Sequence, residues 1–152
     1  MSSTPVRTHG PARLVVADDE THIRLVVAEK FRAAGHIVFE ARDGEEALDL
    51  VREHRPDAII TDLQMPYMSG LELCERLAQD AAAENRTPTP TVLLTARGHI
   101  LEPEQLLRTG IRRVIGKPFG VRDLLEYVQT HLLAAPVSKP DPADSKVECR
   151  AA

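Results

Sequence analysis

Short runs of apolar, mostly β-branched residues alternate along the chain with longer segments in which apolar residues recur every three or four positions. The short runs predict five strands, at residues 13–17, 37–41, 58–61, 91–95 and 113–115. The longer segments predict five helices, at residues 21–34, 43–55, 69–83, 103–110 and 121–133. Strands that alternate with helices in this way form a parallel sheet with helices on both faces, which predicts an α/β fold.

Residue types at the ends of the helical segments support these boundaries. Asp43 with Glu46, and Ser69 with Glu72, have the three-residue spacing of a capping box, in which side chains satisfy the first main-chain N–H groups of a helix. Gly35 follows the first helical segment and is a typical C-terminal cap.

Three of the predicted strands contain continuous apolar stretches, at residues 14–17, 58–60 and 92–94, which is typical of strands that are buried on both faces. In open parallel sheets, ligands bind beyond the carboxyl ends of the strands. The polar residues at those ends are therefore the candidates for chemistry. They are Asp18, Asp19 and Glu20 after the first strand, Asp62 after the third, Thr95 at the end of the fourth, and Lys117 after the fifth.

Each of these residues alone has an ordinary structural explanation. Asp18 or Asp19 could cap the first helix, and Lys117 could be a solvated side chain. Together, carboxylates a few ångströms apart repel by roughly 1–4 kcal/mol per pair, so a cluster of them calls for a cation. Oxygen ligands suit Mg²⁺, and a lysine with a threonine hydroxyl suits phosphate oxygens. The residues thus predict a Mg²⁺-dependent phosphoryl site with an aspartate as candidate nucleophile.

Composition narrows the class of protein. The 152 residues fit one domain with an aliphatic core, since only 3% are aromatic. Two cysteines, Cys74 and Cys149, make no disulfide framework, and no apolar run approaches the roughly 18 residues of a membrane span. A net charge of −4 gives no general attraction to nucleic acid. We therefore expect a cytoplasmic protein without direct membrane or nucleic-acid contacts.

Five ordered motifs resemble the receiver domain of bacterial response regulators. They are VADDE at residues 16–20, ARDGEEAL at 41–48, the segment at 57–62 followed by MPYMSG at 65–70, TA at 95–96, and KPF at 117–119. The resemblance implies a doubly wound, flavodoxin-like (βα)5 fold with strand order 2-1-3-4-5. We expect this domain over residues 12–134, between disordered extensions at 1–11 and 135–152.

The resemblance also implies a mechanism in which the protein is a phosphoacceptor rather than an enzyme. Asp62 would accept a phosphoryl group from a sensor histidine kinase or a histidine phosphotransfer protein. Lys117 and Thr95 would bind that group, and the Lys117–Pro118 peptide bond would be cis. The implied Mg²⁺ ligands are three carboxylates and one main-chain carbonyl, namely Asp18, Asp19, Asp62 and Gln64.

Among the departures from the family pattern, two concern the fourth helix and the fifth strand, on the signalling side of the domain. Val114 occupies a position where the family usually has Tyr or Phe, and a branched aliphatic side chain cannot swing as an aromatic ring does. Gly98 and Pro103 fall where the fourth helix would normally begin, so we expect a short helix with a remodelled entry loop.

The expected signalling partners are proteins, because no second domain is predicted after Leu133. A basic stretch follows Thr95 and would lie on the face formed by helix four, strand five and helix five. It comprises Arg97, Arg108, Arg112, Arg113 and Arg122. This stretch is either a docking surface for an acidic partner or a merely solvated face.

A stand-alone switch and a phosphorelay intermediate are two receiver roles that the sequence does not separate. Three other functions are alternatives to both. A phosphohydrolase of the haloacid-dehalogenase type needs a second acid where this chain has Gln64. A nucleotide-binding domain needs a glycine-rich loop, which does not follow the first strand. A phosphorylation-independent scaffold is favoured by Val114 and disfavoured by the intact acidic cluster.

Overall fold

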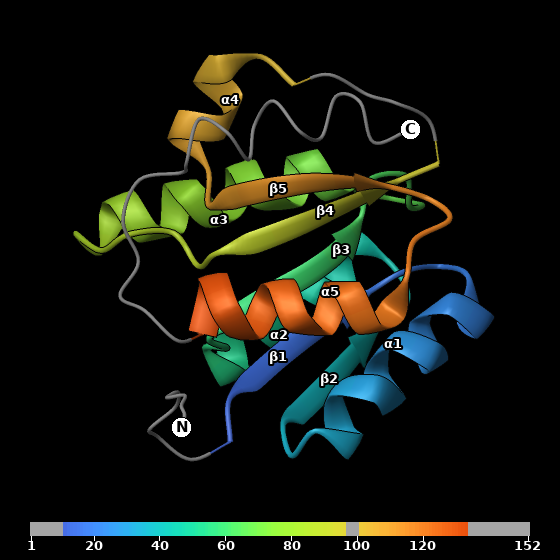
Figure 1. Cartoon of the computed structure of the whole chain (residues 1–152). Helices are drawn as coiled ribbons and strands as arrows, with labels where there is room; N and C mark the ends of the chain where they lie inside the picture. Colours follow the sequence, from blue (N-terminus) through green and yellow to red (C-terminus); the bar gives the residue numbers. More distant parts are fainter. Residues whose placement is uncertain (1–10, 97–100, 134–152) are drawn as a thin grey trace.

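The computed structural model describes residues 11–96 and 101–133. In them, five parallel strands form one sheet in the order β2-β1-β3-β4-β5, as the resemblance implied (Figure 1). The strands are β1 (Arg13–Ala17), β2 (Ile37–Ala41), β3 (Ala58–Asp62), β4 (Thr91–Thr95) and β5 (Ile111–Gly116). The helices are α1 (Thr21–Ala33), α2 (Gly44–His54), α3 (Gly70–Ala83), α4 (Pro103–Arg108) and α5 (Val121–Tyr127), which a π-helical turn, η1 (Val128–Leu133), continues.

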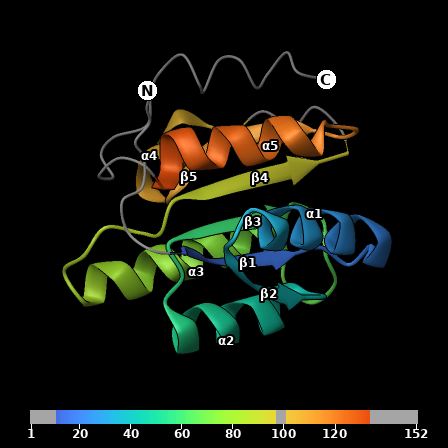
Figure 2. The same cartoon turned by 60° about the horizontal axis from the view of Figure 1, so that its bottom comes forward.

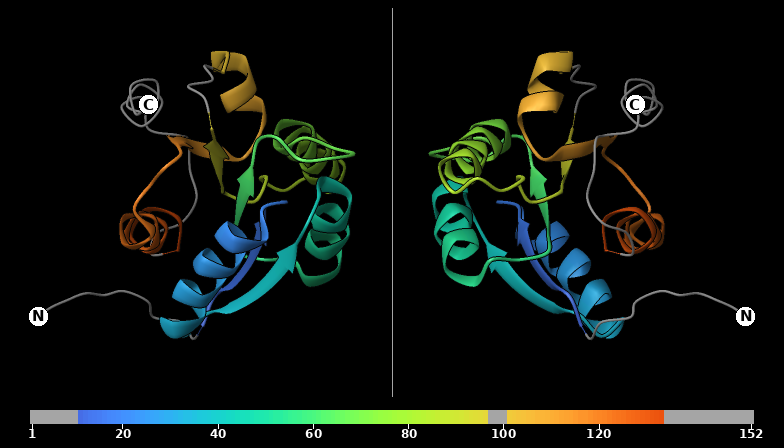
Figure 3. Two further views of the ribbon diagram at one scale, coloured as in Figure 1. Left: turned by 90° about the vertical axis from the view of Figure 1, so that its right-hand side faces the viewer. Right: turned by 90° about the vertical axis from the view of Figure 1, so that its left-hand side faces the viewer.

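The helices cover both faces of the sheet, α1 and α5 on one side and α2 and α3 on the other (Figure 3). Alternate strand residues point to opposite faces. Leu14 and Val16 of β1 pack against α1 and α5, whereas Val15 and Ala17 pack against α2 and α3. All of the strands run in the same direction, so their carboxyl ends meet at one edge of the sheet (Figure 2). That edge is where the candidate residues were expected.

Of the two predicted capping boxes, one forms in full and the other only in part. At the start of α3, Ser69 and Glu72 each accept a hydrogen bond from the other's main-chain N–H, as predicted. At the start of α2, Asp43 accepts from the N–H of Glu46, but the Glu46 carboxylate accepts from the N–H of Arg42 instead of that of Asp43. The second box is therefore one-sided.

Several predicted boundaries were off by a few residues. Helix α1 ends at Ala33 with Ala34 as its cap residue, and Gly35 follows it with a positive φ of 99°. Helix α4 ends at Arg108, before the predicted Gly110. Strand β5 begins at Ile111, two residues earlier than predicted, because Ile111 is fully buried against β4.

Some predictions fall on residues that the structure does not describe. They are the tail at 135–152, the N-terminal extension apart from Pro11, and the entry to the fourth helix with Arg97 and Gly98. The prediction of a short fourth helix is confirmed, since α4 has six residues and begins with Pro103. None of the described helices is both long and apolar enough to cross a membrane.

Candidate functional site

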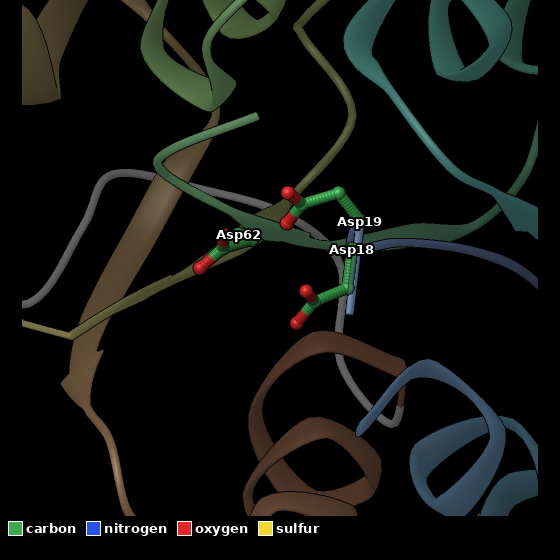
Figure 4. A group of neighbouring side chains, drawn as sticks. All are labelled: Asp18, Asp19 and Asp62. Carbon is green, nitrogen blue, oxygen red and sulfur yellow. The ribbon is translucent and has the colours of Figure 1, made fainter. Parts of the chain in front are cut away.

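Three carboxylates converge at the carboxyl edge of the sheet (Figure 4). Asp18 and Asp19 follow β1, and Asp62 is the last residue of the neighbouring strand β3, one residue beyond the predicted end. One oxygen of each carboxylate lies within 4.8 Å of the others. A cluster of hard oxygen donors at this spacing fits a divalent cation such as Mg²⁺. The structure thus brings together the three predicted carboxylate ligands.

Lys117, which follows β5, lies against this cluster. Its Nζ is 3.1 Å from Asp18 Oδ2, 3.1 Å from Asp62 Oδ1 and 3.0 Å from Glu20 Oε1. Its main-chain N–H donates to the carbonyl of Thr95 (2.7 Å), and its peptide bond to Pro118 is cis, as expected. One ammonium is therefore shared by three carboxylates.

The other two predicted residues lie at the same edge of the sheet. Thr95 is the buried last residue of β4, one position beyond Leu94, which is the partner of Asp62 in the sheet. Gln64 is exposed in the loop that follows Asp62.

Close packing fixes the loop that follows Asp62. A methyl group on Gly70 would collide with the main-chain oxygen of Asp62, and one on Gly44 would collide with that of Met68. Tyr67, exposed at the turn between them, has a positive φ of 70°. The glycines of the DG and MSG motifs thus allow α2 and α3 to begin directly against the site loop.

Two functional contacts were missed by sequence reasoning. Arg24 is buried, and its Nη1 donates to the carbonyl of Asp18 (3.0 Å) while its Nε pairs with Glu40 (3.1 Å). The position of this arginine on the apolar face of α1, one turn before Ala28, is a sequence signal that could have revealed these buried contacts. Glu20 was noted at the strand end without a role, and it is an ion-pair partner of Lys117.

Neither Asp18 nor Asp19 is the N-cap residue of α1, so helix capping does not explain them. Glu20 occupies the N-cap position and its side chain makes no capping hydrogen bond. Asp18 instead accepts from the main-chain N–H of Glu20 (2.9 Å) and from Lys117.

The electrostatics of the site favour protonation of the acids. Burial, followed by the charge of Asp18, raises the pKa of Asp62 to about 6, against the opposing hydrogen bond from Lys117. Burial also raises the pKa of Asp18. Burial disfavours the charged form of Lys117, but its hydrogen bonds to Glu20 and Asp62 outweigh this and raise its pKa. Excess negative charge therefore remains at the site, which suits the binding of a cation.

The position of the usual family aromatic is aliphatic and buried. Val114 packs on the α3 side of the sheet in a cluster with four other buried side chains: Leu63, Cys74, Leu93 and Ile111. One member of this cluster, Leu63, directly follows Asp62 in the sequence.

Comparison with known proteins decides the family. The family model described as "Response regulator receiver domain" matches residues 14–129. The chain belongs to this family. The match favours the receiver domain over the phosphohydrolase and nucleotide-binding classes considered above.

Similar receiver proteins come from several bacteria. Response regulator MprA of Mycobacterium sp. strain KMS is 34% identical over 132 residues, covering 86% of this chain and 55% of its own. The polar-differentiation response regulator DivK of Brucella anthropi is 34% identical, covering 78% and 94%. The structure of chemotaxis response regulator CheY4 of Vibrio cholerae matches with a TM-score of 0.68 at 30% identity, covering 79% and 98%. The receiver chain thus spans about half the length of MprA and nearly all of DivK and CheY4.

Proposed function

We propose that this receiver domain is a phosphorylation switch in which Asp62 accepts a phosphoryl group from a sensor histidine kinase or a histidine phosphotransfer protein. A carboxylate oxygen of Asp62 attacks the phosphorus and forms an acyl phosphate. The bond from phosphorus to the donor histidine nitrogen breaks, and that nitrogen keeps the electron pair. The observation that carries the proposal is the contact of Lys117 Nζ with Asp62 Oδ1 at 3.1 Å inside the three-carboxylate cluster.

The surrounding residues divide the remaining work. Asp18, Asp19, Asp62 and the main-chain carbonyl of Gln64 would hold Mg²⁺, which when bound supplies charge that offsets the phosphoryl oxygens. Lys117 pairs with the transferred group, and the Thr95 hydroxyl donates a hydrogen bond to it. With a pKa of about 6, Asp62 is mainly ionised at neutral pH and able to act as nucleophile.

Output passes to a protein partner on the face formed by α4, β5 and α5. On that face Arg108 pairs with Glu75 of α3 at 2.9 Å, and the Arg113 guanidinium lies 4.8 Å from the centre of the Tyr127 ring. An acidic partner that engages Arg108 would therefore compete with Glu75. Reversing the charges of Arg108 and Arg112 together should weaken partner binding.

Intact mass measurement tests the acceptor. After incubation with acetyl phosphate and Mg²⁺, the protein should gain one phosphoryl group, about 80 Da. Asp62→Ala should gain none, while Asp49→Ala, which changes an exposed aspartate on α2, should gain the same mass as the wild type. A folded wild-type protein that gains no mass would favour a phosphorylation-independent scaffold, the function to which Val114 points.

A further inference from the structure

The ammonium group of Lys117 has as many acceptors as it has protons. A lysine ammonium carries three N–H donors. In this structure it makes three contacts of 3.0–3.1 Å, to carboxylate oxygens of Asp18, Glu20 and Asp62. A phosphoryl group on Asp62 can therefore bond to Lys117 only if the ammonium gives up one of these contacts, either the one to Asp62 itself or one to another acceptor.

The three acceptors differ in how firmly they are held. Asp18 is 1% exposed, with its Oδ1 bonded to the N–H of Glu20 and its main-chain carbonyl bonded to Arg24. Asp62 is the phosphoacceptor itself. The side chain of Glu20 is 60% exposed, and within the described residues its hydrogen bond is to Lys117 alone. Glu20 can thus turn into solvent without leaving a buried partner behind.

We propose that Glu20 is a positioning residue that holds Lys117 in the unphosphorylated protein and releases it to the phosphoryl group. The inference rests on the proposed function, since it requires transfer to Asp62. The incoming group adds negative charge close to Glu20 and competes for the same ammonium, so the exposed carboxylate is displaced. Glu20 therefore slows phosphorylation, because Lys117 must exchange one acceptor for another.

Two substitutions separate the ion pair from the charge. Glu20→Gln removes the charge, whereas Glu20→Asp keeps it on a side chain one methylene shorter, which no longer reaches Lys117. At saturating Mg²⁺, both should raise the rate of phosphorylation by acetyl phosphate about threefold to tenfold. Glu29→Gln, which changes an exposed glutamate on α1, the helix that Glu20 precedes, should leave the rate unchanged. A wild-type rate for Glu20→Asp together with a faster Glu20→Gln would overturn the positioning role and leave only a charge effect.

A spectroscopic measurement follows Lys117 directly. The ¹⁵N resonance of Lys117 Nζ should shift in both Glu20 variants when the protein is unphosphorylated. With excess acetyl phosphate and Mg²⁺, the resonance should coincide in the wild type and both variants, because Glu20 has left. The same shift in both states would overturn the inference, since Glu20 would then remain bound.

The two proposals fail in distinguishable ways. A wild-type protein that gains mass and Glu20 variants that react at its rate would overturn this inference alone. A wild-type protein that gains no phosphoryl group would overturn the proposed function, and this inference with it.

Discussion

At the scale of single residues, the site concentrates more negative charge than its one lysine neutralises. Asp18 and Asp62 are nearly inaccessible to water, and the pKa of each is raised by burial. Carboxylates of this kind destabilise the folded state at neutral pH, because they are ionised there in a less favourable environment than in the unfolded chain. The site is thus retained at a cost in stability, as expected of functional residues.

Asp62→Asn should raise the free energy of unfolding at pH 7.5 in EDTA by on the order of 1–3 kcal/mol. The pKa of Asp62 rises from 3.8 to about 6 on folding, so the folded state holds this proton more tightly than the unfolded state. The cost is absent below pH 3.8, grows through the window from 3.8 to 6, and is complete above it. Urea denaturation at pH 4 and 7.5 checks this, and an equal gain at both pH values would contradict it.

The candidate residues could be predicted from sequence because each follows a strand of a parallel sheet. Asp18, Asp62, Thr95 and Lys117 all lie at the expected edge. The partners of Lys117 could not be predicted, because the choice among nearby acids depends on side-chain reach. The carboxylate oxygens of Glu20 are four bonds from its Cα, so this side chain spans a distance that the strand positions do not reveal.

At the scale of helices and strands, buried polar contacts tie the site to its supports. Arg24 links three segments, since it reaches the carbonyl of Asp18 from α1 and pairs with Glu40 of β2. Glu40 also pairs with Arg32, which is more exposed. The loop after β1 therefore depends on a charged group behind it.

Arg24→Met should weaken Mg²⁺ binding and lower the free energy of unfolding by about 1–3 kcal/mol, because the carbonyl of Asp18 loses a buried charged donor. Arg32→Met is the matched control, as it also removes an ion pair with Glu40 but has no contact with Asp18 in the described structure. Titration calorimetry with MgCl₂ measures both variants. Equal Mg²⁺ affinity in wild type and Arg24→Met would show that Arg24 supports the fold and not the metal ligands.

Ser69→Ala should lower the free energy of unfolding by about 1 kcal/mol, because the first N–H groups of α3 lose their reciprocal cap. Ser69→Asp keeps an acceptor at this position and should stay within about 0.5 kcal/mol of the wild type. Thermal or urea denaturation compares the three proteins. A stable Ser69→Ala would mean that packing alone fixes the start of α3.

Element types were predictable from periodicity, while some ends were not. The start of β5 was missed because Ile111 is a single apolar residue, separated from the predicted strand at 113–115 by the polar Arg112. The change from α5 to the π-helical turn at Val128 leaves the same apolar spacing nearly intact, so the sequence predicted one continuous helix. At α2, the spacing correctly predicted Asp43 as the cap residue, but the Glu46 carboxylate accepts from the N–H of Arg42 instead of that of Asp43.

At the scale of the whole molecule, the sheet and its helices form a scaffold for an acidic cluster that fits a divalent cation. Mg²⁺ should raise the melting temperature of the wild type by roughly 5–10 °C at a hundredfold excess over its dissociation constant, since binding at that level contributes about 2.7 kcal/mol. Asp62→Asn should respond much less, because it lacks one of the clustered carboxylates. Calorimetric scans with MgCl₂ and with EDTA test this, and an equal response of both proteins would place the ion elsewhere.

The strand order was implied by the family resemblance, and it decides which distant segments become neighbours. Periodicity alone predicts a parallel sheet, but it does not say that β1 pairs with β3 or that β5 lies at the edge beyond β4. The domain bounds of 12–134 stay a prediction, since residues outside 11–96 and 101–133 are not described.

Lys117 lies 99 positions after its partner Asp18, which has a consequence for the newly made protein. At about 5–20 residues per second, the ribosome adds those residues over roughly 5–20 s. In the later part of that interval, once Asp62 has been made, the acidic cluster has no ammonium, and β4 and β5 are still to be added beyond β3. If Lys117 binds the phosphoryl group as proposed, a growing chain therefore holds that group less well than a finished molecule, because Lys117 is made only after the last strand.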